Sequence, residues 1–170
     1  LNIVKGEKHA IVGENGAGKS TLMKILNGLY TPTSGTISLK GKVADIKGPG
    51  EAAKLGIGMV YQHFMLVPTL TVAENMILGV EPTKGMNLDI NKAREDVRKV
   101  SEKYGLAIDP DAIISDLSVG IQQRVEILKI LFKGADLLIF DEPTAVLIPQ
   151  EVKELYKIMD NLIEEGKTII

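Results

Sequence analysis

The feature that most constrains this chain is the glycine-rich segment from Gly13 to Ser20, which reads Gly-Glu-Asn-Gly-Ala-Gly-Lys-Ser. It matches the spacing G-x-x-x-x-G-K-[ST] of a phosphate-binding loop. The segment Lys8 to Val12 precedes it and is predicted as a buried strand, while Gly18 to Tyr30 has the apolar spacing of a helix. This strand, loop and helix are the context that the motif requires, so the sequence predicts a nucleotide site in an α/β fold.

Each part of this loop has an expected role. The glycines let successive N–H groups turn toward phosphate oxygens, and the helix N-terminus adds partial positive charge. Lys19 is expected to reach the β- and γ-phosphates, Ser20 to ligate Mg²⁺, and Thr21 to lie toward the α-phosphate. The alternative is a glycine-rich turn that binds no ligand. The expected nucleotide-binding set is Gly13, Glu14, Asn15, Gly16, Ala17, Gly18, Lys19, Ser20 and Thr21.

Two carboxylates follow a second apolar segment, Leu137 to Phe140. Ligands of open parallel sheets bind outside the carboxyl ends of the strands, so Asp141 and Glu142 are expected beside the phosphates. Asp141 is expected to hold Mg²⁺ through a water, and Glu142 to polarise or deprotonate the attacking water. An ordinary helix cap after a strand is the alternative. The phosphate-binding loop upstream favours the catalytic interpretation.

The rest of the chain alternates between strand and helix patterns. Further strands are expected at Thr36 to Leu39, Gly58 to Tyr61 and Lys167 to Ile170. The alternation predicts a parallel sheet that is covered by helices on both faces. Since the last predicted strand is cut off, the 170 residues are expected to form a single domain that is truncated at both ends.

The middle of the chain is predicted to be helical and to contain no strand. Thr71 is expected to cap a helix that ends at Leu78, with Glu74 completing a capping box. Asn91 to Tyr104 is amphipathic, and Ser118 is expected to cap a helix that ends near Phe132. The prediction is a helical subdomain of about residues 71–132, inserted into a core of about residues 1–70 and 133–170.

Three further segments make the chain resemble the ABC ATPase family. They are Gln62 after a strand, Leu117 to Arg124 (Leu-Ser-Val-Gly-Ile-Gln-Gln-Arg), and the run from Glu142 to Glu151. The resemblance implies a P-loop NTPase fold with a RecA-like, mostly parallel sheet, antiparallel β elements and the helical subdomain. It also implies that Gln62 contacts Mg²⁺ and the attacking water. Ser118 and Gly120 would bind the γ-phosphate of an ATP held by another domain, in a head-to-tail pair.

Three positions depart from the family pattern. Val119 stands where glycine permits close approach to phosphate, Ile121 replaces a glutamine, and Ile148 replaces an aspartate. These departures indicate that one half-site of the pair is less active. The run Glu-Pro-Thr-Ala-Val-Leu resembles bacterial simple-sugar and nucleoside importers that carry two ATPase domains in one chain, and this chain resembles the first of them.

The resemblance implies partners as well. They are a second ATPase domain, expected in the same parent chain, transmembrane permease subunits, and indirectly a solute-binding protein. The location would be the cytoplasmic face of the bacterial membrane. Phe64 to Val67 is expected near the permease or, alternatively, in the core. Family members also have an adenine-stacking aromatic residue, expected upstream of Leu1, and a switch histidine, expected beyond Ile170. His9 and His63 are not expected to replace it.

Composition narrows the alternatives. The net charge of −2 argues against a nucleic-acid partner, and so against a soluble ABC ATPase of DNA repair or translation. The stretch between Gln62 and Leu117 also lacks the sustained heptads of a long coiled coil. A third interpretation is a module that binds ATP but turns it over slowly in this truncated form. The main prediction is an ATP-hydrolysing motor domain with ATP and Mg²⁺ as ligands.

Overall fold

A three-stranded parallel sheet lies at the centre of the computed structural model, which describes residues 1–80, 83–84 and 87–170. The strand order is β3-β6-β7. Val60 pairs with Phe140, and Leu138 pairs with Ile169, so the carboxyl ends of the strands meet at one edge. The predicted parallel sheet is confirmed. Its strands are β3 (Ile57–Val60), β6 (Leu137–Phe140) and β7 (Thr168–Ile169).

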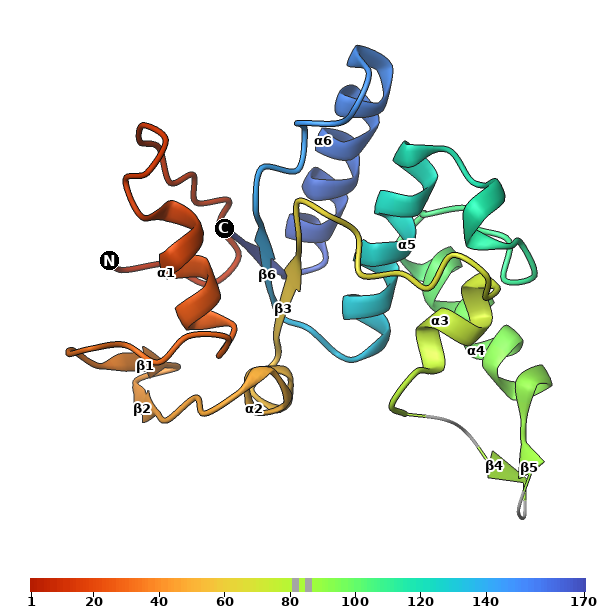
Figure 1. Cartoon of the computed structure of the whole chain (residues 1–170), viewed down its shortest axis with the longest axis horizontal. Coiled ribbons are helices and arrows are strands. Elements are labelled where there is room, and N and C mark those ends of the chain that lie inside the picture. Colours follow the sequence, from red (N-terminus) through yellow and green to blue (C-terminus); the bar gives the residue numbers. More distant parts are fainter. Residues whose placement is uncertain (81–82, 85–86) are drawn as a thin grey trace.

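Helices cover both faces of this sheet, as predicted for an α/β fold (Figure 1). Side chains of β6 alternate between two cores. Leu138 and Phe140 pack with the helices of one face, while Ile139 packs with Met23 on the other. The first face carries α5 (Val119–Phe132) and α6 (Pro149–Glu164), and the second carries α1 (Lys19–Leu26) and α2 (Pro49–Lys54).

A group of helices lies beyond α5, away from the sheet (Figure 1). It contains α3 (Val72–Ile77), α4 (Ile90–Lys103) and the 3₁₀ turn η1 (Ile114–Asp116). The predicted capping box of α3 is confirmed: the Thr71 N–H donates to Glu74 Oε2 at 2.8 Å, and the Glu74 N–H donates to Thr71 Oγ1 at 3.3 Å. Because α5 packs against β3 as well as α3 and α4, it joins this group to the sheet.

The expectation that the middle of the chain contains no strand is wrong. Two short strands, β4 (Thr83–Lys84) and β5 (Asn87–Leu88), pair in an antiparallel hairpin before α4. Strands of two residues are too short to show an alternating pattern, which is why the sequence did not indicate them. The predicted division into a core and a helical subdomain stays a prediction.

The expected buried strand from Lys8 to Val12 is also wrong. The His9 N–H donates to the Ile169 carbonyl at 2.8 Å, and Lys8 forms one isolated bridge with Ile169. Lys8 is exposed, and Val12 is 92% exposed. The segment therefore lies beside β7 but pairs with it for only one residue before the glycine-rich loop begins.

The helix predicted to reach Tyr30 ends at Leu26, because Gly28 adopts a left-handed φ of 74°. A Cβ atom on Gly28 would lie 2.6 Å from the Gly48 carbonyl group, so only glycine fits. An antiparallel hairpin follows, formed by β1 (Ile37–Leu39) and β2 (Lys42–Ala44). No helix among the described residues has both the length and the apolar composition needed to cross a bilayer.

Candidate nucleotide-binding site

The glycine-rich loop leads into α1 with its lysine folded back over it. Gly16 and Gly18 have φ values of 84° and 91°, a left-handed conformation that glycine adopts at no steric cost. Lys19 Nζ donates to the carbonyl oxygens of Gly13 at 2.7 Å and Glu14 at 3.0 Å. The loop is exposed, whereas Lys19 and Ser20 are half-buried. The loop thus presents its main chain and one ammonium group together at a helix N-terminus, which favours anions.

The two predicted segments meet at Ser20 and Asp141. Ser20 Oγ donates to Asp141 Oδ1 at 2.8 Å, across 121 positions of sequence. The Asp141 N–H donates to the Val60 carbonyl at 3.1 Å, which holds the aspartate at the carboxyl end of the sheet. The loop and the carboxylates that follow β6 therefore lie on the same side of the molecule.

Glu142 adopts the left-handed backbone conformation, with a φ of 49°, which residues other than glycine rarely adopt. Left-handed residues other than glycine cost about 1–3 kcal/mol and cluster at functional sites. The Ala145 N–H donates to the Glu142 carbonyl at 3.2 Å, which closes a tight turn just after β6. A hollow of about 330 Å³ lies beside this turn and is lined by Glu142, Asp141, Lys19 and His9.

Gln62 leaves the sheet at the same edge as Asp141, because β3 and β6 are parallel and in register. Its side chain is exposed. With His63 it lines a hollow of about 370 Å³ that Val119 and Gln122 also line. The segment that follows β3 therefore faces the beginning of α5.

Ser118 and Gly120 lie at the N-terminus of α5. Ser118 caps the helix, since its Oγ accepts from the Ile121 N–H at 3.4 Å. Gly120 is buried, and its N–H donates to Glu151 Oε1 at 3.1 Å. The Gly120 N–H, which the resemblance assigns to the ATP of a partner domain, is thus hydrogen-bonded within this chain in the structure.

Sequence reasoning missed the residues that hold α5 to the loop after β6. Glu151 fills the space over Gly120, where an added Cβ would lie 2.4 Å from Glu151 Oε1, and also accepts from the Ile148 N–H at 3.2 Å. Gln123 is 3% exposed and donates to the Pro143 carbonyl at 2.6 Å. Of these two residues, only Glu151 could have been found from the sequence. It is the third residue of a helix that starts with proline, where a glutamate often bonds to the N-cap N–H.

The oxygen groups gathered at this edge fit a magnesium–nucleotide complex. A hydroxyl, a carboxylate and an amide oxygen, from Ser20, Asp141 and Gln62, are hard ligands of the kind that Mg²⁺ prefers. Mg²⁺ usually takes only one or two such groups from the protein, with phosphates and waters completing the shell. The contact between Ser20 and Asp141 brings two of the three groups together.

Comparison with known proteins agrees with this geometry. A family model described as "ABC transporter" matches residues 1–145. The chain is 62% identical over 170 residues to the nucleoside import ATP-binding protein NupA of Lactococcus lactis, and 59% identical to the guanosine import ATP-binding protein NupO of Bacillus subtilis. Both alignments cover all of this chain but only 34% and 33% of those relatives, so the chain spans about a third of their length.

Solved structures show the same architecture. CbiO1 of Clostridium perfringens, part of the ABC transporter complex cbiONQ, has 35% identity and a TM-score of 0.80, over 100% of this chain and 68% of that one. A nucleotide-free ATP-binding cassette of an ABC transporter has 26% identity and a TM-score of 0.85, over 99% of this chain and 71% of that one. The resemblance predicted from Gln62, Leu117 to Arg124 and Glu142 to Glu151 is confirmed.

Proposed function

Because this chain belongs to the ABC transporter family, we propose that it is the ATP-binding and ATP-hydrolysing part of an importer for nucleosides or simple sugars. The observation that carries the proposal is the hydrogen bond of 2.8 Å between Ser20 Oγ and Asp141 Oδ1. It joins the phosphate-binding loop to the strand that bears Glu142. The choice of cargo is supported by the names of the two relatives above and by the run Glu-Pro-Thr-Ala-Val-Leu.

The residues of the site have separate tasks in this proposal. The main-chain N–H groups of Gly13 to Ser20 and the charge of Lys19 bind the phosphates, and Thr21 lies toward the α-phosphate. Ser20, Gln62 and Asp141 hold Mg²⁺, which when bound supplies positive charge that stabilises the phosphates in the transition state.

Glu142 orients the attacking water and accepts its proton. Its turn lies just beyond β6, at the same edge that carries Asp141, and Glu142 lines the hollow there. Gln62 lies on the neighbouring strand end, where its amide can both accept and donate a hydrogen bond.

The partners follow from the family. Ser118 and Gly120 would bind the ATP of a second ATPase domain in a head-to-tail pair within the same parent chain, which requires the Gly120 N–H to exchange its bond with Glu151 for the phosphate. The domain would lie at the cytoplasmic face of the bacterial membrane, held there by permease subunits that receive cargo from a solute-binding protein. Met65 is 63% exposed and Val67 is 39% exposed, whereas Leu66 packs against the core. Met65 and Val67 are therefore offered as the permease contact.

The test uses two substitutions in the full-length parent transporter. Lys19→Ala should abolish ATP binding, measured with a fluorescent ATP analogue, while Lys24→Ala on the same helix should bind like the wild type. Glu142→Gln should retain ATP and lose turnover by on the order of 10²–10⁴-fold, since a general base contributes that much. Wild-type nucleotide affinity in Lys19→Ala, or wild-type hydrolysis in Glu142→Gln, would contradict the proposal.

A further inference from the structure

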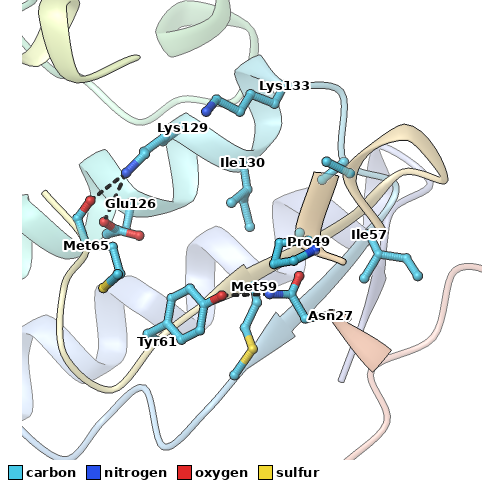
Figure 2. A pocket seen from close by; sticks show the side chains of 13 residues that line it. Asn27, Pro49, Ile57, Met59, Tyr61, Met65, Glu126, Lys129, Ile130 and Lys133 are labelled. Carbon is cyan, nitrogen blue, oxygen red and sulfur yellow. Dashed lines mark hydrogen bonds and ion pairs between the residues drawn. The ribbon is translucent and has the colours of Figure 1, made fainter. Parts of the chain in front are cut away.

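A lysine of α5 holds the main chain of the segment that follows Gln62. Lys129 Nζ donates to the Met65 carbonyl at 2.6 Å, and only 16% of the Lys129 side chain is exposed (Figure 2). Glu126, one turn earlier on the same helix, has its Oε1 atom 3.7 Å from Lys129 Nζ. The Met65 N–H also faces the Glu126 carboxyl group and favours its charged form. Both main-chain groups of Met65 therefore face the same charged pair.

Packing alone does not explain why a glutamate occupies the buried position 126. The residue is 2% exposed, and its Oε1 atom has no hydrogen-bond partner. It borders a hollow of about 200 Å³ that is also lined by Tyr61, Met65 and Lys129 (Figure 2). A buried polar atom without a partner costs about 1–3 kcal/mol, so an apolar side chain would be the more stable choice here. The carboxylate does have one evident use, which is to orient the ammonium group of Lys129.

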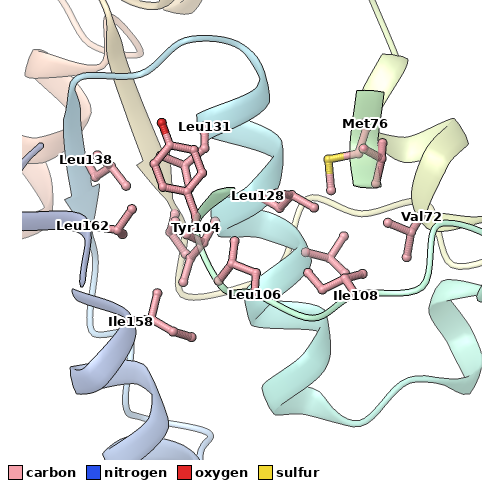
Figure 3. Close-up of a cluster of buried hydrophobic side chains, with 14 of the residues drawn as sticks. Val72, Met76, Tyr104, Leu106, Ile108, Leu128, Leu131, Leu138, Ile158 and Leu162 are labelled. Carbon is pink, nitrogen blue, oxygen red and sulfur yellow. The ribbon is translucent and has the colours of Figure 1, made fainter. Parts of the chain in front are cut away.

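The helix that carries this pair is packed firmly. Leu128 and Leu131, on its buried side, lie in one hydrophobic cluster with Leu138 of β6 and Leu162 of α6 (Figure 3). Leu128 is fully buried and Leu131 is 5% exposed. A helix held in this way moves as a rigid body, so a displacement at its middle is carried to its end.

The same helix also reaches the other parts of the site. Lys129 follows Ser118 by 11 positions, which at 1.5 Å per residue is roughly 16 Å along the helix axis. Between them, Gln123 donates to the Pro143 carbonyl at 2.6 Å, next to Glu142. One rigid element therefore contacts the segment that follows Gln62 and the loop that contains Glu142, and Ser118 caps its N-terminus.

We propose that Lys129, oriented by Glu126, is a positioning residue for Gln62. Lys129 holds the Met65 carbonyl and so fixes residues 62–65 to α5. Gln62 and Ser118 therefore change position together. Neither Lys129 nor Glu126 is among the residues that line the hollow beside Glu142. This inference rests on the proposed function, because it assigns a mechanical role within the same ATPase site.

The kinetic test compares substitutions in the full-length parent transporter. Lys129→Met should lower kcat for ATP hydrolysis about tenfold and change KM for ATP less than about twofold, since an interaction needed only for turnover lowers kcat alone. Lys129→Arg, which keeps a charged donor, should recover most of the rate. Lys133→Met is the matched control, because Lys133 lies four residues further along, at the C-cap of α5, and donates to the Leu78 carbonyl at 3.0 Å. It should hydrolyse ATP like the wild type.

Hydrogen exchange supplies a measurement that needs no activity. Amides of residues 62–66 should exchange faster in Lys129→Met than in the wild type, while those of α4 should be unchanged. If methionine at 129 prevents folding, Glu126→Gln removes the charge that faces Lys129 at nearly constant shape. It should speed the same exchange and lower kcat by a smaller factor.

The outcomes separate the two proposals. A wild-type transporter that hydrolyses no ATP would refute the proposed function, and the exchange data would still decide the role of Lys129. Wild-type kcat and exchange in Lys129→Met would overturn the inference. A raised KM with unchanged kcat would do the same, as would an equal loss of rate in Lys133→Met.

Discussion

Gly58 lies within β3 at the point where this strand meets α5, and replacing it by alanine should separate the two. A Cβ atom on Gly58 would lie 2.8 Å from the Cβ atom of Ile130 and 3.0 Å from that of Ala135. Both neighbours are attached directly to the backbone, so no side-chain rotation can relieve these contacts. Alanine at position 58 therefore requires α5 itself to shift away from the sheet.

Two opposing effects determine how much Gly58→Ala lowers the free energy of unfolding. Overpacking a core costs about 1–3 kcal/mol. Alanine also restricts the unfolded chain, which stabilises the fold by about 0.4–1 kcal/mol. Because both close contacts are with fixed atoms, the first effect should dominate and leave a net loss of about 1–2 kcal/mol for Gly58→Ala. For a chain of this size, such a loss lowers Tm by about 2–8 °C.

Urea unfolding and thermal melts of Gly58→Ala measure this loss, with Gly50→Ala in α2 as the matched control. A Cβ atom on Gly50 would meet no atom within 4 Å. Gly50→Ala should therefore be neutral or more stable by up to about 1 kcal/mol, as expected for alanine within a helix. If Gly58→Ala is as stable as Gly50→Ala, the close approach of β3 and α5 does not exist in solution.

Two further predictions concern a helix cap and a buried acid. Thr71→Ala removes the side chain that accepts from the Glu74 N–H and should cost about 1 kcal/mol in urea unfolding; Thr69→Ala, at an exposed threonine, should cost little, and equal losses would argue against the cap. Burial raises the pKa of Glu126 despite the opposing charges of Lys129 and Lys133, so the folded state holds the proton more tightly than the unfolded state. The free energy of unfolding should therefore fall as the pH rises from the ordinary carboxyl pKa through the raised one, and Glu126→Gln should remove this decline. Wild-type and Glu126→Gln unfolding curves that stay parallel across that pH range would refute the assignment.

Much of the fold could be predicted because its signals are local. The capping box of Thr71 and Glu74, and the apolar run of β6 followed by two acids, are each contained in a few consecutive residues. The expected meeting of the phosphate-binding loop with these acids needed only one general rule about the carboxyl ends of parallel strands. The contact between Ser20 and Asp141 agrees with it.

What could not be predicted depends on contacts between distant residues. Lys129 and Met65 are 64 positions apart, and Gly120 and Glu151 are 31 apart, so no local pattern pairs them. The segment from Lys8 to Val12 has the composition of a strand, but whether it pairs is decided by how it meets β7. A lysine or a glutamate on a helix is usually exposed to solvent. Only the structure shows that Lys129 and Glu151 are half-buried and contact distant residues.

The alternation of β6 between two cores also decides which carboxylate can reach Ser20. Leu138 and Phe140 face α5 and α6, and Ile139 faces α1, so the next position on the α1 side belongs to Asp141. Deleting one residue from this strand would turn Asp141 away from Ser20 and bring Glu142 into its place. The apolar side chains of β6 thus set which carboxylate lies beside Ser20, although their own place is in the two cores.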